Sequence, residues 1–259
     1  MEILKQNFLN TTTQFVVNSN TATVGNIYLR DTKFQYASNA LNDDNTTATV
    51  TINFDVTTTV DRIAMVEHNV KSFTIFYNGA TANTLSLDAG QNTTTSDYST
   101  NSDTSHYFMF TPVNVTSLTF DLKQTIIADS NKAIGYLVVS ELRTDFDDRI
   151  PSAQNYTTVI QPRAVVHRLS DGGTRIQTLD EKRRTSFAFE HLTRSTRDTL
   201  KEIYDEHLEI VFSAFGTSTG WDAVIYPAVW EGDFNFYKFS DNASDSGFSG
   251  SLNLLETPL

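Results

Sequence analysis

The sequence predicts a mainly β protein with two domains, and three observations support this prediction. The chain of 259 residues contains 37 Thr and 20 Asn, about three times and nearly twice their usual shares. Thr is β-branched and suits a half-exposed strand surface, whereas Asn suits turns. Short alternating segments recur along the chain, and its length accommodates two domains of ordinary size.

The first predicted domain spans residues 1–142 and shows the clearest alternation. In Ala48–Asp55, apolar side chains alternate with Thr and Asn, so one face of the predicted strand is apolar. Ala89–Ser105 is mostly Thr, Ser, Asn and Asp, which predicts a long polar loop. The other strands predicted in this domain are Asp61–His68, Ser72–Tyr77, His106–Thr111, Ser117–Leu122 and Ala133–Ser140.

A linker is predicted at residues 143–155, where charges and a proline occur without periodicity. The second domain, residues 156–259, opens with strands at Arg163–Leu169 and Arg175–Leu179. The Asp171-Gly172-Gly173 segment between these strands is typical of a hairpin turn. Further strands are predicted at Thr185–Glu190, Glu209–Phe215, Ala223–Trp230, Phe234–Ser240 and Gly247–Leu255.

One helix is predicted, at about residues 195–208. Ser195 is a suitable N-cap, and Asp198 stands three residues later, where it can bond back to the cap. The side chains expected on one face of this helix are Leu200, Ile203, Tyr204 and His207.

The charge of the chain argues against two classes of partner. The formal net charge is −12 and the isoelectric point is about 4.7, so we expect no nucleic-acid partner and no attraction to an anionic membrane. Apolar runs are too short to span a bilayer, which predicts no membrane insertion. The first residues lack the pattern of a signal peptide and there is no cysteine, so synthesis in the cytoplasm is expected.

No complete catalytic pattern is present, and we therefore predict that the protein is not an enzyme and needs no cofactor. Gly216–Gly220 matches the G-x-S-x-G motif around Ser218, but no histidine follows it and a strand is predicted next. The five histidines match no metal-binding spacing. There is no phosphate-binding loop and no dinucleotide-binding glycine motif.

Asn42-Asp43-Asp44-Asn45 leaves two interpretations open. Asp43 and Asp44 supply hard oxygen ligands of the kind that calcium prefers, but clusters of Asp and Asn also form ordinary turns.

Basic residues concentrate between Arg163 and Lys201, whereas residues 202–259 contain ten acidic residues and Lys238 as the only basic one. Three interpretations follow: an anion-binding patch, a solvated rim, or a head-to-tail contact with an acidic copy of the same chain. The last predicts a ring, although the two segments could also pair within one fold. The residues proposed as assembly contacts are Lys182, Arg183, Arg184, Arg194 and Arg197.

The first domain resembles discoidin-like jelly rolls of the galactose-binding type. The resemblance lies in Ala48–Gly79, with His68-Asn69 and Tyr77-Asn78-Gly79, and in Lys132–Arg143. It implies a jelly-roll β-sandwich, and members of this family often bind glycans.

The second domain resembles the C-terminal part of minor tail and baseplate proteins of tailed bacteriophages, including distal tail proteins. The similar segments are Val165–Ile176, Thr185–His207 and Ala228–Glu256. The resemblance implies a tail-tube-like β-sandwich with one flanking helix, a module that builds rings.

Taken with that resemblance, the sequence predicts a structural component of a phage tail tip or baseplate. It would form part of a ring and present an outer β domain, located in the virion after synthesis in the host cytoplasm. The expected partners are other copies of the chain, other tail or baseplate proteins and a host surface glycan. The alternative is a glycan- or receptor-binding adhesin of the virion.

Overall fold

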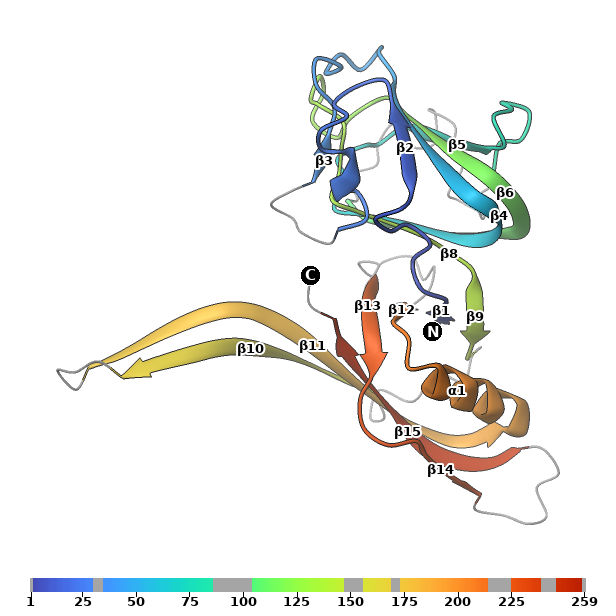
Figure 1. Ribbon diagram of the computed structural model, residues 1–259, viewed down its shortest axis with the longest axis vertical. Helices are drawn as coiled ribbons and strands as arrows, with labels where there is room; N and C mark the ends of the chain where they lie inside the picture. The colour runs from blue at the N-terminus through green and yellow to red at the C-terminus, as the bar shows by residue number, and fades with distance from the viewer. Residues whose placement is uncertain are drawn as a thin grey trace. The chain divides into compact units, whose positions relative to one another are not determined.

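The protein is mainly β, as the sequence predicts, with one α-helix among the described residues (Figure 1). The computed structural model describes residues 2–29, 35–85, 104–146, 156–168, 173–213, 225–238 and 246–257. The chain divides into two compact units. The N-terminal unit comprises residues 2–143 with 213–225, and the C-terminal unit comprises residues 144–212 with 226–258.

The N-terminal unit is built around two long antiparallel strands, β4 (Ala48–Val66) and β6 (His106–Leu122). Its main sheet has the order β2-β4-β6-β5, and β8 also pairs with β4. The short strands β3 and β7 form a separate ladder, and β1 pairs with β9. The remaining elements are β1 (Glu2–Leu4), β2 (Gln14–Val17), the 3-10 helix η1 (Val24–Asn26), β3 (Tyr36–Ala37), β5 (Phe73–Tyr77), β7 (Ala133–Ile134), β8 (Tyr136–Ser140) and β9 (Leu142–Asp145), whose last two residues belong to the C-terminal unit.

Each long strand joins two segments that the sequence predicts separately. The register of β4 against β6 shifts between Asn53 and Thr58, and residues 55–57 between them are exposed. The chain stays extended across this bulge because Val56 and the three threonines that follow are β-branched. The irregularity bends the strands around one core.

The core of the N-terminal unit is a continuous apolar cluster drawn from both ends of β4 and β6. Ile52 and Val50 come from the first half of β4, while Val60 and Ile63 come from its second half, and all four are fully buried. Aromatic side chains fill the remaining volume, among them Tyr36, Phe73, Phe108 and Phe120.

The C-terminal unit contains a sheet with the order β10-β11-β15-β13-β12, and β14 also pairs with β15. Its elements are β10 (Tyr156–Arg168), β11 (Thr174–Thr193), α1 (Arg194–Glu206), β12 (Ile210–Ser213), β13 (Ile225–Trp230), β14 (Asn235–Lys238) and β15 (Ser246–Glu256). The hairpin predicted around Asp171-Gly172-Gly173 is the β10–β11 pair. Here too, one strand, β11, covers both Arg175–Leu179 and Thr185–Glu190, with a register shift against β10 at Arg163/Ala164.

The helix begins at a different cap from the one that the sequence predicts. Its N-cap is Thr193, whose hydroxyl accepts a hydrogen bond from the Thr196 backbone N–H at 3.1 Å. Ser195 lies inside the first turn, so the expectation that it caps the helix is wrong. The helix ends at Glu206, and His207 follows in the left-handed conformation with φ 50°. Thr193 is the N-cap instead of Ser195 because Thr193 is the last residue of β11, where the chain leaves the strand and turns into the helix.

The apolar face of α1 is shorter than the sequence predicts. Leu200 and Ile203 are buried. Tyr204 is only half-buried and packs edge-on against Trp230, while His207 is exposed. The core of the C-terminal unit is largely aromatic and includes Phe146, Phe187, Phe189, Phe212, Tyr226 and Phe236.

Candidate binding surfaces

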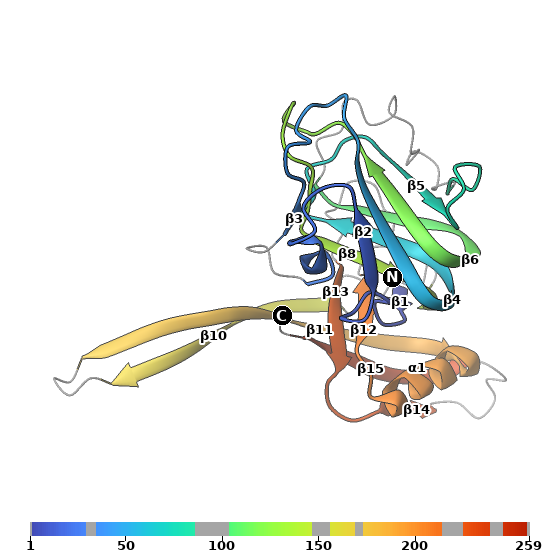
Figure 2. The same cartoon turned by 45° about the horizontal axis from the view of Figure 1, so that its top comes forward.

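A two-stranded arm extends from the sheet of the C-terminal unit (Figures 1 and 2). Strand β15 pairs with β11 only from Arg184 onward. The preceding part of β11 pairs with β10 alone. We call residues 159–168 of β10 and 174–183 of β11 the arm. It is a two-stranded ribbon because, among the described strands, β10 has β11 as its only neighbour.

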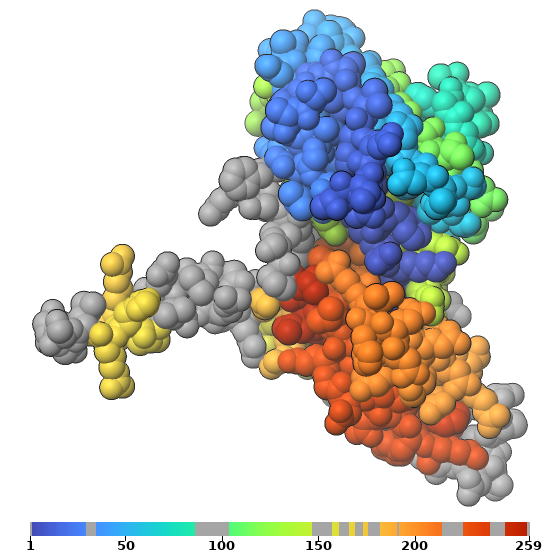
Figure 3. Space-filling view, viewed as in Figure 1, coloured from blue at the N-terminus to red at the C-terminus, as the bar shows by residue number. Residues whose placement is uncertain are grey.

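The arm exposes aliphatic side chains on both faces. The exposed fractions are 44% for Val159, 55% for Ile160 and 58% for Val166. Neighbouring residues of a strand point to opposite faces, so Val159 lies on one face and Ile160 and Val166 lie on the other. The described side chains of the arm stand apart from the sheet in the space-filling view (Figure 3). A two-stranded ribbon is marginally stable by itself, so this one is expected to gain stability from a partner.

The arm is basic although the chain is acidic. It carries five basic residues against Asp180 and Glu181. Because like charges repel, the partner it favours has an acidic surface. The five basic residues are Arg163, Arg168, Arg175, Lys182 and Arg183.

The predicted assembly contacts do not form one patch. Lys182, Arg183 and Arg184 lie near the base of the arm, whereas Arg194 and Arg197 lie ten or more residues further along, in α1. Ten residues of strand span roughly 30 Å. The basic cluster of the sequence is therefore spread along β11 and into the helix.

Three of these basic residues have partners within the C-terminal unit. Arg184 donates to Glu231 at 2.6 Å. The guanidinium of Arg183 lies 5.7 Å from the centre of the Tyr226 ring. Arg197 pairs with Asp198 and lies over two phenylalanine rings. Lys182 is partly exposed and Arg194 is exposed.

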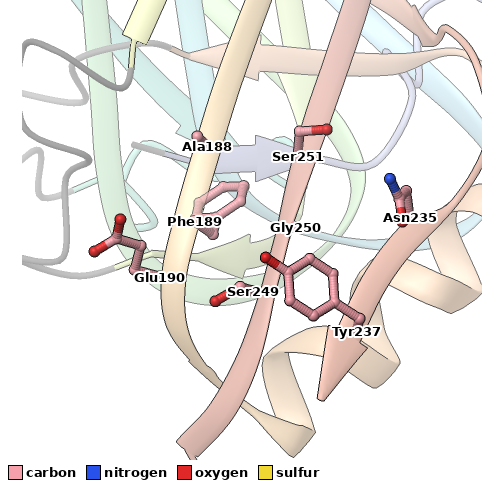
Figure 4. A pocket seen from close by; sticks show the side chains of 8 residues that line it. All are labelled: Ala188, Phe189, Glu190, Asn235, Tyr237, Ser249, Gly250 and Ser251. Atoms are coloured by element: carbon pink, nitrogen blue, oxygen red, sulfur yellow. The ribbon is translucent and has the colours of Figure 1, made fainter. Parts of the chain in front are cut away.

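A hollow of about 520 Å³ lies on the sheet beside the base of the arm (Figure 4). Ala188 and Glu190 of β11 are exposed, whereas Phe187 and Phe189 are buried, so the hollow occupies the face opposite the aromatic core. Its floor is made of small side chains. Glu190 stands on the β11 side and Tyr237 on the β14 side. The lining residues are Ala188, Phe189, Glu190, Asn235, Tyr237, Ser249, Gly250 and Ser251.

A glycine is required in β15 beneath the hollow, because a side chain at Gly250 would point into the aromatic core on the opposite face of the sheet. Gly250 pairs with Phe236 across β14 and β15. A Cβ at Gly250 would lie 2.5 Å from the Phe236 ring and 2.5 Å from the Asn235 carbonyl oxygen. Neither a backbone oxygen nor a buried ring can withdraw cheaply, so the position excludes a side chain.

A smaller pocket of about 190 Å³ lies in the N-terminal unit, between the segment that precedes β2 and the bulge of β4. Amide, hydroxyl and carboxylate groups line it together with two phenylalanine rings. Such a lining offers hydrogen-bond donors and acceptors beside an apolar surface. The lining residues are Gln6, Phe8, Asn10, Thr12, Thr13, Asn53, Phe54, Asp55, Val56 and Thr58.

The Asn42–Asn45 loop, considered above as a calcium site, surrounds the ammonium group of Lys132. The Nζ of Lys132 donates to the carbonyl oxygens of Leu41 at 2.5 Å and Asp43 at 2.8 Å. It also lies 3.4 Å from the Thr46 hydroxyl. Burial lowers the pKa of Lys132, and the nearby carboxylates of Asp44, Asp43 and Asp129 oppose that shift. The oxygens that a cation would use therefore surround the positive charge of Lys132.

The carboxylate of Asp44 is occupied by hydrogen bonds within the protein and holds the loop to Thr125. Its carboxylate accepts from the backbone N–H and the hydroxyl of Thr125, both at 3.0 Å. The pKa of Asp44 is lowered, since these hydrogen bonds and that from the Asp129 N–H outweigh the cost of burial. Within the described residues, no three His, Cys, Asp or Glu side chains gather as a metal site would require.

A second buried charge cluster joins β1 to β4 and β6. Arg62 donates from Nε and from Nη2 to the two carboxylate oxygens of Glu2, at 3.1 and 2.9 Å. The Tyr107 hydroxyl donates to the same carboxylate. Burial raises the pKa of Tyr107 well above its ordinary value and also raises that of Asp61, which pairs with Arg62 at 3.5 Å. All the polar groups have partners, which is the arrangement of a structural cluster.

Ser218 and its motif lie outside the described residues. Among the helices of the described chain, none has the length and apolar character needed to cross a membrane.

No family model matches the chain, and no curated protein matches it. Solved structures that are similar to about half of the chain include carbohydrate-binding modules. The module CpGH89CBM32-6 of Clostridium perfringens is 13% identical with a TM-score of 0.40, covering 52% of this chain and 99% of that one. Chitosan-binding module 1 of a chitosanase/glucanase from Paenibacillus sp. IK-5 is 12% identical with a TM-score of 0.40, covering 52% and 97%. A family 32 module from C. perfringens in complex with galactose is 13% identical with a TM-score of 0.37, covering 50% and 93%.

Proposed function

We propose that this chain is a structural component of a phage tail tip or baseplate. Its C-terminal unit forms part of a ring of identical copies, and its N-terminal unit is the outer β domain. The observation that carries the proposal is the arm, a basic ribbon that exposes Val159, Ile160 and Val166. Exposed aliphatic side chains on an edge ribbon are costly in a free monomer and are favourable once a partner covers them.

The charge distribution supports a partner of the same kind. The arm has a surplus of basic residues, while residues 202–259 contain ten acidic residues and one lysine. A contact from the basic arm to an acidic region of a neighbour is heterologous, and heterologous contacts close into rings when the rotation allows it. The resemblance of Val165–Ile176 and Ala228–Glu256 to tail proteins supports placement in the virion.

The test is the copy number of the chain in purified particles. Quantitative mass spectrometry against the major tail protein should give a fixed small multiple per virion, retained after the fibres are stripped. A variable or sub-stoichiometric amount, lost together with the fibres, would argue for a detachable adhesin.

A second candidate function is glycan binding by the N-terminal unit, and the 190 Å³ pocket favours it. Its amides and Asp55 suit paired sugar hydroxyls, and Phe8 and Phe54 offer apolar surface for the ring of a sugar. The pocket is smaller than most sites for drug-sized ligands, which favours a single sugar residue.

Glycan-array binding of the whole chain tests this second function. The variants Asn53→Ala and Asp55→Asn should lose any array signal, whereas Asp198→Asn in the other unit should keep it. Binding that survives both pocket variants would place the sugar elsewhere, and an array without signal would remove the function.

A further inference from the structure

Two surfaces of the C-terminal unit complement each other. Ile160, Val166 and Arg168 share one face of the arm, because residues an even number apart on a strand point the same way. All three are exposed. The hollow offers a floor of small side chains and the exposed carboxylate of Glu190 at its rim.

The arm cannot reach the hollow of its own chain. Val166 pairs with Ile176 across the arm, and Ala188 lies twelve residues further along the same strand, β11. At about 3.3 Å per residue, the two positions are separated by roughly 40 Å of continuous strand. Contact between the arm and the hollow is therefore possible only between two chains.

We infer that the arm of one copy docks in the hollow of the next copy. Val166 enters the hollow beside Ala188, and the guanidinium of Arg168 pairs with the carboxylate of Glu190. The Arg–carboxylate pair fixes the register, and burial of the aliphatic side chains supplies most of the affinity. The inference rests on the proposed self-assembly and deepens it by naming the two surfaces.

The geometry sets the kind of assembly. The arm and the hollow are different surfaces, so each copy uses one of them toward each neighbour. A series of such contacts between successive copies forms a ring when the last copy meets the first.

Disulfide trapping tests the inference cleanly because the chain contains no cysteine. Chains that carry Val166→Cys are mixed with chains that carry Ala188→Cys, and the mixture is oxidised. We expect a covalent dimer that contains one chain of each kind. The matched control replaces Ala188→Cys with Asp198→Cys, an exposed site on α1, and should give no covalent dimer above background.

Sedimentation velocity of the unsubstituted chain distinguishes failure of the docking inference from failure of the proposed self-assembly. An oligomer without trapping, or with equal trapping at Asp198→Cys, would overturn the docking inference and leave the proposed function standing. A monomer without trapping would overturn both.

A charge swap gives a second test. Arg168→Glu alone and Glu190→Arg alone should each weaken assembly at least tenfold, while the double variant should recover it. Failure of the double variant to recover, with each single variant folded, would exclude the Arg168–Glu190 contact.

Discussion

The Nε2 of His68 lies 2.6 Å from the Nδ1 of His106, and both side chains are buried. The Val70 backbone N–H donates to the other ring nitrogen of His68 at 3.1 Å. That nitrogen therefore carries no proton, and Nε2–H donates to His106. Burial, together with the repulsion that would arise if both rings were protonated, lowers the pKa of His68 to about 3. His68 is therefore neutral in the folded chain near pH 7, and both imidazole rings pack edge-on against Phe73.

The lowered pKa of His68 predicts a loss of stability in mild acid. The unfolded chain binds a proton at His68 near pH 6.5, whereas the folded chain binds it near pH 3. Stability from this group is therefore complete above pH 6.5 and falls as the pH drops from 6.5 toward 3. We expect about 2 kcal/mol less stability at pH 5 than at pH 7.

Urea unfolding at the two pH values measures this difference. The variant His68→Gln should show a much smaller difference, while His207→Gln, at an exposed site, should behave like the unsubstituted chain. An unchanged difference in His68→Gln would assign the pH dependence to other groups.

Because the ammonium group of Lys132 occupies the loop considered for calcium, we expect the N-terminal unit to be stable without calcium. Lys132→Met should destabilise the N-terminal unit by on the order of 3 kcal/mol, because the carbonyls of Leu41 and Asp43 lose a charged donor. Lys123→Met, a partly exposed control, should cost less than about 0.5 kcal/mol. Thermal unfolding of the unsubstituted chain should not change with calcium or with a chelator. A calcium-dependent rise in its Tm would contradict this assignment.

The helix cap gives a matched pair of substitutions. Thr193→Ala removes the bond to the Thr196 N–H and should cost about 1 kcal/mol. Ser195→Ala should be nearly neutral, since that residue lies inside the first turn. Leu200→Ala should cost about 2–5 kcal/mol, because the side chain is fully buried. Chemical unfolding measures all three, and equal costs at Thr193 and Ser195 would refute the cap.

The buried ion pair between Arg62 and Glu2 predicts that substitutions at these two residues have strongly coupled effects on the free energy of unfolding. Arg62→Met should cost about 3–5 kcal/mol, because it leaves the buried Glu2 carboxylate without its bidentate partner. The double variant Arg62→Met with Glu2→Gln should be less destabilised than the sum of the single variants. A double-mutant cycle by urea unfolding measures the coupling, and additive costs would show that the two side chains act independently.

Local patterns predicted the positions of the strands better than their continuity. The alternation in Ala48–Asp55 correctly identified the start of β4. The same alternation predicts a strand that ends at Asp55, although the β-branched residues that follow can carry the chain extended through a bulge. The cap at Thr193 was missed because Ser195 and Asp198 form a competing pattern three residues apart.

The candidate surfaces depend on contacts between distant parts of the sequence. The Asp171-Gly172-Gly173 turn indicated a hairpin, but nothing nearby shows that β15 stops pairing at Arg184. The hollow requires the register of Ala188 with Ser251, residues that are 63 positions apart. Lys132 was missed for the same reason, although a lysine before the apolar run Ala133–Val139 is a usable signal.

Assembly through the arm is tested most directly by the mass of the purified chain in solution. Sedimentation velocity should find a closed oligomer of the unsubstituted chain. The triple variant Val159→Thr, Ile160→Thr and Val166→Thr keeps β-branched residues in the arm but removes its apolar surface. This variant should sediment as a monomer with an unchanged circular dichroism spectrum. A monomeric unsubstituted chain, or an oligomer that survives the triple substitution, would contradict assembly through the arm.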